Sequence, residues 1–175
     1  LTDDYAAIRR EMEAVAAFFG KKVLREVKEE DLFANLSAVR EKLGDRACLR
    51  AIHFFAECRR AAVLYQDVAD DRFDDFLSDI IQGGHSSFEY NQNAYSIKHP
   101  AQQGVSLGLA VSQRLLTGKG AWRLQGGGFA GTIQAFVPVE MLDEYKSALE
   151  AVFSEGSCYV LNVRNYGAVP VTPDM

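Results

Sequence analysis

The chain has 175 residues, of which 48% are hydrophobic and 25% charged, and its formal net charge is −5. This length and composition are typical of one globular domain with a sizeable core, and they exclude a disordered chain. The acidic balance, without a basic run, excludes a nucleic-acid backbone as the expected partner. No apolar stretch approaches the roughly 20 residues of a membrane span, so we expect no membrane partner either.

Helical periodicity dominates the chain up to residue 116 and returns once later. Apolar residues recur from Ile8 to Phe19 at the spacing of one helix face, and Gly20 ends the pattern. Lys21 to Val27 is either a short strand or an extended link. Gly83-Gly84 either ends a helix or marks a close approach within it. This reasoning predicts helices over residues 2–19, 31–43, 46–68, 73–81, 105–116 and 142–153.

Two β-patterned runs flank a glycine cluster. AWRLQ at 121–125 alternates apolar and polar residues, and TIQAFVP at 132–138 is rich in residues that favour strands. A third run, CYVLNV at 158–163, follows the last helix and also predicts a strand. The order of elements indicates one α+β domain over residues 1–175, in which helices pack on a small antiparallel sheet.

The three cysteines, Cys48, Cys58 and Cys158, are sparse and lack the spacing of a zinc site. Cys48 and Cys58 share one predicted helix, on which ten residues span roughly 15 Å, too far for a disulfide. We therefore expect reduced thiols and a cytoplasmic location.

The glycine cluster GGGFAG, Gly126 to Gly131, is the unusual feature of the sequence. It lacks the Lys-Ser or Lys-Thr of a P-loop, and it precedes a strand, whereas GxGxxG opens a helix. One interpretation is a hairpin turn with positive φ angles. The other is a backbone that approaches a ligand or a second loop closely, with successive N–H groups forming an anion-binding concavity. Three consecutive glycines exceed the need of a two-residue turn and favour the second interpretation.

The stretch AWRLQGGGFAGTIQAFVP resembles the third motif of the GHMP kinases, and in particular the galactokinase form, an Arg and two residues before GGGFGG and a strand ending in Pro. Ala130 stands where glycine is usual. Three further stretches, DYAAIRREMEAVAAFFG, GGHSSFEY and YVLNVRNYGA, resemble galactokinase sequences, in order and at fitting spacings over nearly the whole chain. The matching motif residues are Arg123, Gly126, Gly127, Gly128, Phe129 and Gly131.

The resemblance implies the carboxy-terminal half of a galactokinase, with a ferredoxin-like two-layer arrangement. Such kinases transfer the γ-phosphoryl group of MgATP to the C1 hydroxyl of galactose. The motifs that bind ATP and magnesium lie in the amino-terminal half of such kinases, and so does the catalytic Asp. None of them is found in this sequence. We therefore expect a part of a longer chain, consistent with its start at Leu1, that has no catalytic or metal-binding residue of its own and is inactive alone.

Site residues follow from the same resemblance. Gly126, Gly127, Gly128 and Gly131 are expected to lie against the ATP-phosphate loop of the other half. Tyr5 matches the tyrosine that hydrogen-bonds the sugar, although three residues separate Tyr5 from Arg9 where the family commonly has two. The alternative for Tyr5 is a partly buried helix residue without a ligand.

Two accessory residues have structural alternatives. Arg123 either faces the nucleotide or forms a surface ion pair, and His85 either bonds a helix end near the cleft or takes part in catalysis. We expect His53 to be an interior or boundary residue. Trp122 is expected in the core or at an interface.

Two rival functions remain open at this stage. The first is a kinase for another sugar, N-acetylgalactosamine or arabinose. The second is a non-catalytic galactose sensor that uses the kinase fold to bind a partner protein. We also expect the chain to self-associate through apolar surface that would otherwise face the amino-terminal domain.

Overall fold

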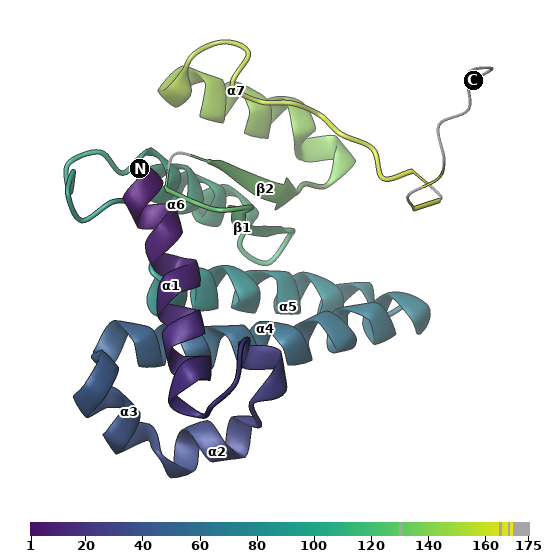
Figure 1. Ribbon diagram of the computed structural model, residues 1–175. Helices are drawn as coiled ribbons and strands as arrows, with labels where there is room; N and C mark the ends of the chain where they lie inside the picture. Colours follow the sequence, from purple (N-terminus) through teal and green to yellow (C-terminus); the bar gives the residue numbers. More distant parts are fainter. Residues whose placement is uncertain (130, 165, 168, 170–175) are drawn as a thin grey trace.

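The computed structural model describes residues 1–129, 131–164, 166, 167 and 169. In these residues seven α-helices accompany one two-stranded sheet (Figure 1). The helices are α1 (Thr2–Phe18), α2 (Glu29–Ala34), α3 (Leu36–Leu43), α4 (Asp45–Ala69), α5 (Phe73–Ser86), α6 (Gly104–Leu116) and α7 (Leu142–Phe153). The strands are β1 (Ala121–Gln125) and β2 (Thr132–Phe136). The α+β class, with helices packed on a small antiparallel sheet, is confirmed.

The first core lies among the amino-terminal helices. Helix α1 packs across α4, and α2 and α3 close the far end of this helical layer (Figure 1). Val15, Leu32 and Val39 are fully buried there, because the apolar stripes of α1, α2 and α3 all face inward. Helix α4 contributes buried residues along its first half, which agrees with its central place in the layer.

The second core lies around the β-hairpin. Strand β1 pairs antiparallel with β2 in a register that places Ala121 opposite Phe136 and Gln125 opposite Thr132. Trp122 is buried in one cluster with Leu116, Tyr145 and Leu149, so α6 and α7 both cover the hairpin. The expectation of a core position for Trp122 is confirmed.

Helix α5 joins the two cores through a glycine pair. Gly83 and Gly84 lie inside the helix, so they do not end it. A Cβ on Gly84 would lie 3.1 Å from Cβ of Arg123 and 3.2 Å from the Trp122 carbonyl oxygen, both on β1. The pair therefore lets the helix backbone approach the strand closely, as one of the two sequence interpretations held.

Three expectations differ from the structure. The segment from Lys21 to Val27 is neither a strand nor simply extended, since it contains a 3₁₀ turn at Leu24–Glu26 with extended residues on both sides. The predicted helix over 31–43 is two helices, since the backbone leaves helical geometry at Asn35 with φ −115°. A side-chain bond from Asn35 to the Asp31 carbonyl ends α2 there.

The third correction concerns the run CYVLNV at 158–163, which forms no strand. Among the described residues no strand pairs with it, and Tyr159, Leu161 and Val163 are 83, 85 and 92% exposed. Figure 1 shows this segment extending past α7 without a neighbouring strand. Strand propensity requires a partner edge and a surface to cover, and the described part of this chain offers the run neither.

No helix in the described part of the chain has the length and apolar character that a membrane crossing requires.

Candidate functional site

The glycine loop, which we define as residues 126–131, connects β1 to β2. Ala130, the departure from the family motif, lies outside the described residues. Gly126 and Gly128 have φ angles of +70° and +82°, which glycine adopts without the steric cost of a Cβ. Phe129 also has a positive φ, +56°. The hairpin interpretation is thus right about positive φ, but it does not explain Gly127.

Close approach explains Gly127 and adds a second constraint at Gly128. A Cβ on Gly127 would lie 2.7 Å from Cε1 of Tyr5, and a Cβ on Gly128 would lie 2.0 Å from the main-chain oxygen of Asn93. Neither space admits a methyl group. A Cβ on Gly126 would meet nothing within 4 Å, so this side of the loop is open. The loop therefore has one face packed on Tyr5 and Asn93 and one open position.

Hydrogen bonds fix the packed face. The Tyr5 hydroxyl donates to the Gly128 carbonyl at 2.7 Å, and the Phe129 N–H donates to the Asn93 carbonyl at 2.6 Å. The Asn93 side-chain amide donates to the Gly127 carbonyl at 3.2 Å. The rings of Tyr5 and Phe129 meet edge to face, with centroids 5.1 Å apart. Residues far apart in sequence thus define the shape of the loop.

Ion pairs and hydrogen bonds hold Tyr5 and Asn93 in place. Tyr5 lies in the first turns of α1, whose Asp4 accepts a hydrogen bond from Ser96 at 2.9 Å. This bond ties the start of α1 to the segment that carries Asn93. The buried guanidinium of Arg50 donates to the Asn91 carbonyl and pairs with Glu11 of α1 at 2.8 Å.

Three galactokinases align with most of this chain. The galactokinase of Mannheimia succiniciproducens is 28% identical over 149 residues, which are 85% of this chain and 37% of that protein. The galactokinase of Actinobacillus pleuropneumoniae is 29% identical over 147 residues, 83% of this chain and 36% of that protein. The galactokinase of Haemophilus influenzae is 26% identical over 149 residues, 85% of this chain and 37% of that protein.

The chain is a distant homologue of the galactokinases. It spans little more than a third of the length of those it matches, 36 or 37%. No protein-family model matches the chain.

The extra residue between Tyr5 and Arg9, relative to the galactokinase pattern, does not keep Tyr5 away from the glycine loop. Arg9 points to solvent and pairs with Glu13 one turn along α1, while Tyr5 still lies against the glycine loop. The Tyr5 side chain remains 40% exposed. Its hydroxyl uses its proton on Gly128 and retains lone pairs that can accept from a ligand hydroxyl.

Arg123, a residue of the galactokinase motif, is held away from the loop. Its guanidinium lies 3.2 Å from a carboxylate oxygen of Glu57, whose other oxygen lies 2.5 Å from Arg60. All three side chains are at most a quarter exposed. The structure therefore shows an ion pair, as one sequence alternative held, but it joins α4 to β1 and is largely buried, whereas the sequence placed it at the surface.

His53 and His85 differ in burial. His53 is buried, as expected, and its Nδ1 lies 2.9 Å from the Ser86 hydroxyl. Burial lowers the pKa of His53, against the raising effect of Glu57 and with the added lowering effect of Arg123. His85 is exposed in the last turn of α5, and no side-chain hydrogen bond joins it to the described residues of the glycine loop.

The Glu11 carboxylate is the centre of a second charged cluster. Its burial acts to raise its pKa, but hydrogen bonds and charges from Arg46 and Arg50 outweigh this effect and hold the pKa below the usual range. Arg46 donates to both carboxylate oxygens, at 2.6 Å and 3.2 Å for the shortest contacts to each. Removing either arginine alone would leave a partly buried charge poorly compensated.

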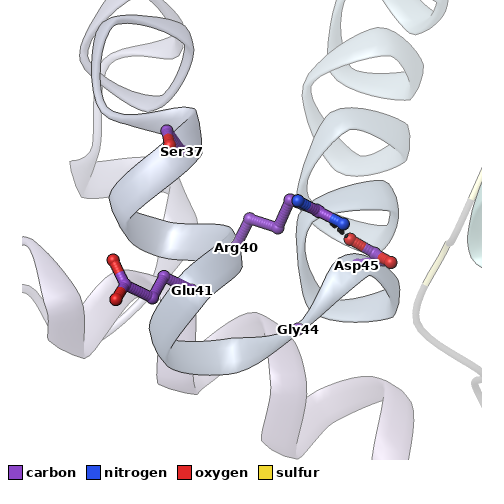
Figure 2. Close-up of a pocket in the computed structure, with 5 residues that line it drawn as sticks. All are labelled: Ser37, Arg40, Glu41, Gly44 and Asp45. Carbon is purple, nitrogen blue, oxygen red and sulfur yellow. Dashed lines mark hydrogen bonds and ion pairs between the residues drawn. The ribbon is translucent and has the colours of Figure 1, made fainter.

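Two surface hollows lie outside the glycine loop. The larger, about 490 Å³, lies between α3 and the start of α4 and is lined by exposed polar residues, with an Arg40–Asp45 ion pair across it (Figure 2). The other, about 290 Å³, lies beside the start of α1 and is lined by both signs of charge, from Asp3, Asp4, Ala7, Arg10, Arg46, Arg50, Ile97 and Lys98. Neither contains Tyr5 or a glycine of the loop.

The resemblance to galactokinases leads us to expect MgATP, so we compare the described residues with what a phosphate and a metal ion require. The positive φ angles at Gly126 and Gly128 are compatible with a loop whose N–H groups converge on an anion. Within the described residues, no group of three or more His, Cys, Asp or Glu side chains gathers as a metal site.

Asn93 is the site residue that the sequence analysis missed. It lies in a polar stretch, HSSFEYNQNAYS, whose composition does not distinguish it from its neighbours. The one available signal was indirect, since three successive glycines imply a close partner somewhere in the chain.

Proposed function

We propose that this chain is the carboxy-terminal, glycine-loop part of a galactokinase, which transfers the γ-phosphoryl group of MgATP to the C1 hydroxyl of galactose. The observation that supports this most directly is the hydrogen bond between Tyr5 and Gly128. It joins the residue proposed for the sugar to the loop proposed for the phosphates, although 123 residues separate them.

Phosphoryl transfer requires this neighbourhood. The accepting hydroxyl and the γ-phosphorus must approach to roughly 3–3.5 Å in line, so groups that hold the sugar and groups that hold the phosphates lie side by side. Tyr5 places its lone pairs at the edge of the glycine loop. A sugar hydroxyl that donates to Tyr5 would lie next to a phosphate received by the loop.

The proposed roles are those of positioning and not of proton transfer. Tyr5 orients the sugar, and Gly126, Gly127, Gly128 and Gly131 form a wall of the phosphate site. MgATP supplies the phosphoryl group, with the metal and most phosphate contacts provided by the rest of the galactokinase. Arg123 joins β1 to α4 through its ion pair with Glu57, and we assign it no contact with substrate.

Three accompanying statements belong to the same proposal. Residues 1–175 form one domain that completes a cleft with the remainder of the enzyme. The chain alone is inactive and self-associates, since Leu161, Val163 and other apolar side chains at 158–163 are exposed. The complete enzyme is cytoplasmic.

Galactose-dependent ADP release tests the proposal. The complete gene product and residues 1–175 are assayed side by side with MgATP, first with galactose and then with N-acetylgalactosamine and arabinose. We expect turnover of galactose by the complete gene product and none by residues 1–175. A preference for another sugar would replace the substrate. Galactose binding without ADP release would favour a sensor.

A further inference from the structure

Asn93 is bonded to the glycine loop at two points. Its main-chain oxygen accepts from the Phe129 N–H at 2.6 Å, and its side-chain amide donates to the Gly127 carbonyl at 3.2 Å. The two bonds reach loop residues on either side of Gly128. One residue therefore fixes the path of the backbone through the middle of the loop.

The backbone of Gly128 lies so close to Asn93 that no side chain could fit between them. A Cβ on Gly128 would lie 2.0 Å from the Asn93 oxygen and 2.8 Å from its Nδ2. Asn93 itself is only 3% exposed, so water does not replace its bonds readily. The loop is thus in direct contact with the side chain and main chain of a buried residue.

The backbone before Asn93 has an unusual geometry, which places Asn93 against the glycine loop. A π-helical turn, Ser87–Asn91, extends α5, and Gln92 then adopts a left-handed conformation with φ 54° and ψ 49°. Both features are uncommon, and π-turns are frequently found at functional sites. Arg50 holds the end of the turn by donating to the Asn91 carbonyl at 3.0 Å.

The bonds from Asn93 and Tyr5 use a particular set of loop atoms. They occupy the carbonyls of Gly127 and Gly128 and the N–H of Phe129. They do not use the N–H groups of Gly127 or Gly128. The Gly127 carbonyl and the Gly128 N–H belong to one peptide group, so holding this carbonyl on Asn93 directs the Gly128 N–H away from Asn93, towards the side on which we propose that an anion is received.

We propose that Asn93 is a positioning residue that sets the glycine loop in its phosphate-receiving conformation. This inference rests on the proposed function, because the loop is taken as the phosphate site. Asn93 touches neither sugar nor nucleotide and acts through Gly127 and Phe129. Its effect is therefore expected on the use of MgATP and not on the affinity for sugar.

Asn93→Asp in the complete gene product tests the proposal. The substitution preserves size and main-chain bonds, but it places a carboxylate oxygen against the Gly127 carbonyl, an acceptor against an acceptor. Asn35→Asp is the matched control, since the Asn35 amide also donates to a main-chain carbonyl, that of Asp31 at 2.9 Å, far from the loop. Initial rates are measured against MgATP and galactose separately, and amide hydrogen exchange is followed by mass spectrometry in the peptide that covers the loop.

We expect Asn93→Asp to lower kcat/KM for MgATP by about tenfold or more, the effect of roughly one lost or reversed hydrogen bond. The KM for galactose should stay within about twofold, and loop exchange should accelerate. Asn35→Asp should change none of these. If Asn93→Asp fails to fold, Asn93→Ala, which removes the side-chain amide and keeps the main-chain bond to Phe129, takes its place.

Unchanged loop exchange in the Asn93 variant would overturn the positioning role, and so would an effect confined to the KM for galactose. Absence of galactose-dependent ADP release in the unmodified protein would overturn the proposed function instead. In that case the exchange comparison still decides whether Asn93 holds the loop, so the two failures are distinguishable.

Discussion

Two glycine clusters in this chain bring backbone into close contact with another segment, and they do so differently. In the glycine loop, positive φ angles at Gly126 and Gly128 turn the chain, and Gly128 meets the Asn93 main chain. In α5, Gly83 and Gly84 keep helical geometry, and Gly84 meets β1 at Arg123. The loop requires glycine both for its positive φ angles and for the lack of a Cβ, whereas α5 requires it only for the lack of a Cβ.

The two clusters therefore have different structural roles: one sets the position of a helix, and the other sets the conformation of the glycine loop. The pair in α5 determines how closely the helix lies on β1, and β1 leads directly into the glycine loop. The loop glycines then determine the conformation presented to a ligand. A substitution in α5 should therefore act on stability, and a substitution in the loop should act on stability and catalysis together.

Gly128→Ala should have the largest effect. It imposes a left-handed conformation on alanine, at about 1–2 kcal/mol, and it drives a Cβ into the Asn93 main chain, which cannot rotate away. We expect a loss of about 3 kcal/mol or more in the free energy of unfolding of residues 1–175, measured in urea. The complete gene product should lose at least about 100-fold in kcat/KM for MgATP.

Gly126→Ala is the control for Gly128→Ala. Its φ of +70° carries the same conformational cost, but a Cβ there meets nothing within 4 Å. We expect a loss of only about 1–2 kcal/mol. Equal losses at the two positions would contradict the role that we give to Asn93.

Gly84→Ala should have the next largest effect and should not alter the chemistry. The added methyl must displace Cβ of Arg123 at 3.1 Å and two main-chain atoms of β1 at 3.2 Å, while the helix gains about 1 kcal/mol of propensity. The net loss should be about 1–2 kcal/mol, with kcat per folded molecule unchanged. A Cβ at Gly83 would lie 2.9 Å from the Arg123 guanidinium and 3.3 Å from Cδ of Arg60, which are side-chain atoms and can shift more easily than backbone. Gly83→Ala should therefore cost less than Gly84→Ala, and a larger loss at Gly83 would refute this account.

Tyr5→Phe should cost about 1 kcal/mol in the stability of residues 1–175, since it removes one neutral hydrogen bond to Gly128 and keeps the ring against Phe129. In the complete gene product it should also raise the KM for galactose, because the acceptor for the sugar is removed. An unchanged KM for galactose would reassign Tyr5 to a structural role on the loop. Tyr65→Phe, at an exposed tyrosine, is the control.

The smallest effect should be a pH dependence from His53. Burial lowers its pKa in the folded chain, among Glu57, Arg123 and Arg60, so the unfolded chain binds the proton more readily. This contribution to stability is complete above the unfolded pKa of about 6.5 and is lost as the pH falls through the lower folded pKa. His53→Gln should flatten the dependence of unfolding free energy between pH 7.5 and 5.5, and the exposed His85→Gln should leave it unchanged.

Local patterns predicted most helices and the hairpin well. The long helices α1, α4 and α6 have apolar periodicity over at least three turns, and AWRLQ and TIQAF differ from it in period. Patterns failed where the outcome depends on a partner. The 158–163 run has strand propensity but no neighbouring edge, and Asn35 ends a helix through a bond that periodicity does not register.

The candidate site was predictable only in part, for the same reason. The glycine cluster predicted that its backbone lies close to a ligand or to another loop, and the resemblance to galactokinases indicated Tyr5 as a site residue. The partner that the loop contacts within this chain, Asn93, could not be found from local sequence. Its position results from a π-helical turn, a left-handed Gln92 and a buried arginine, and each depends on tertiary contacts.

The burial of Trp122 has a spectroscopic consequence. It is the single tryptophan of the chain, is 7% exposed, and lies on the strand that enters the glycine loop. Its fluorescence therefore reports on the hairpin core alone, whereas far-ultraviolet circular dichroism reports mainly on the helices. Denaturation curves from the two signals would coincide if both cores unfold as one cooperative unit. Separate midpoints would show that the hairpin and its loop melt independently of the amino-terminal helical layer.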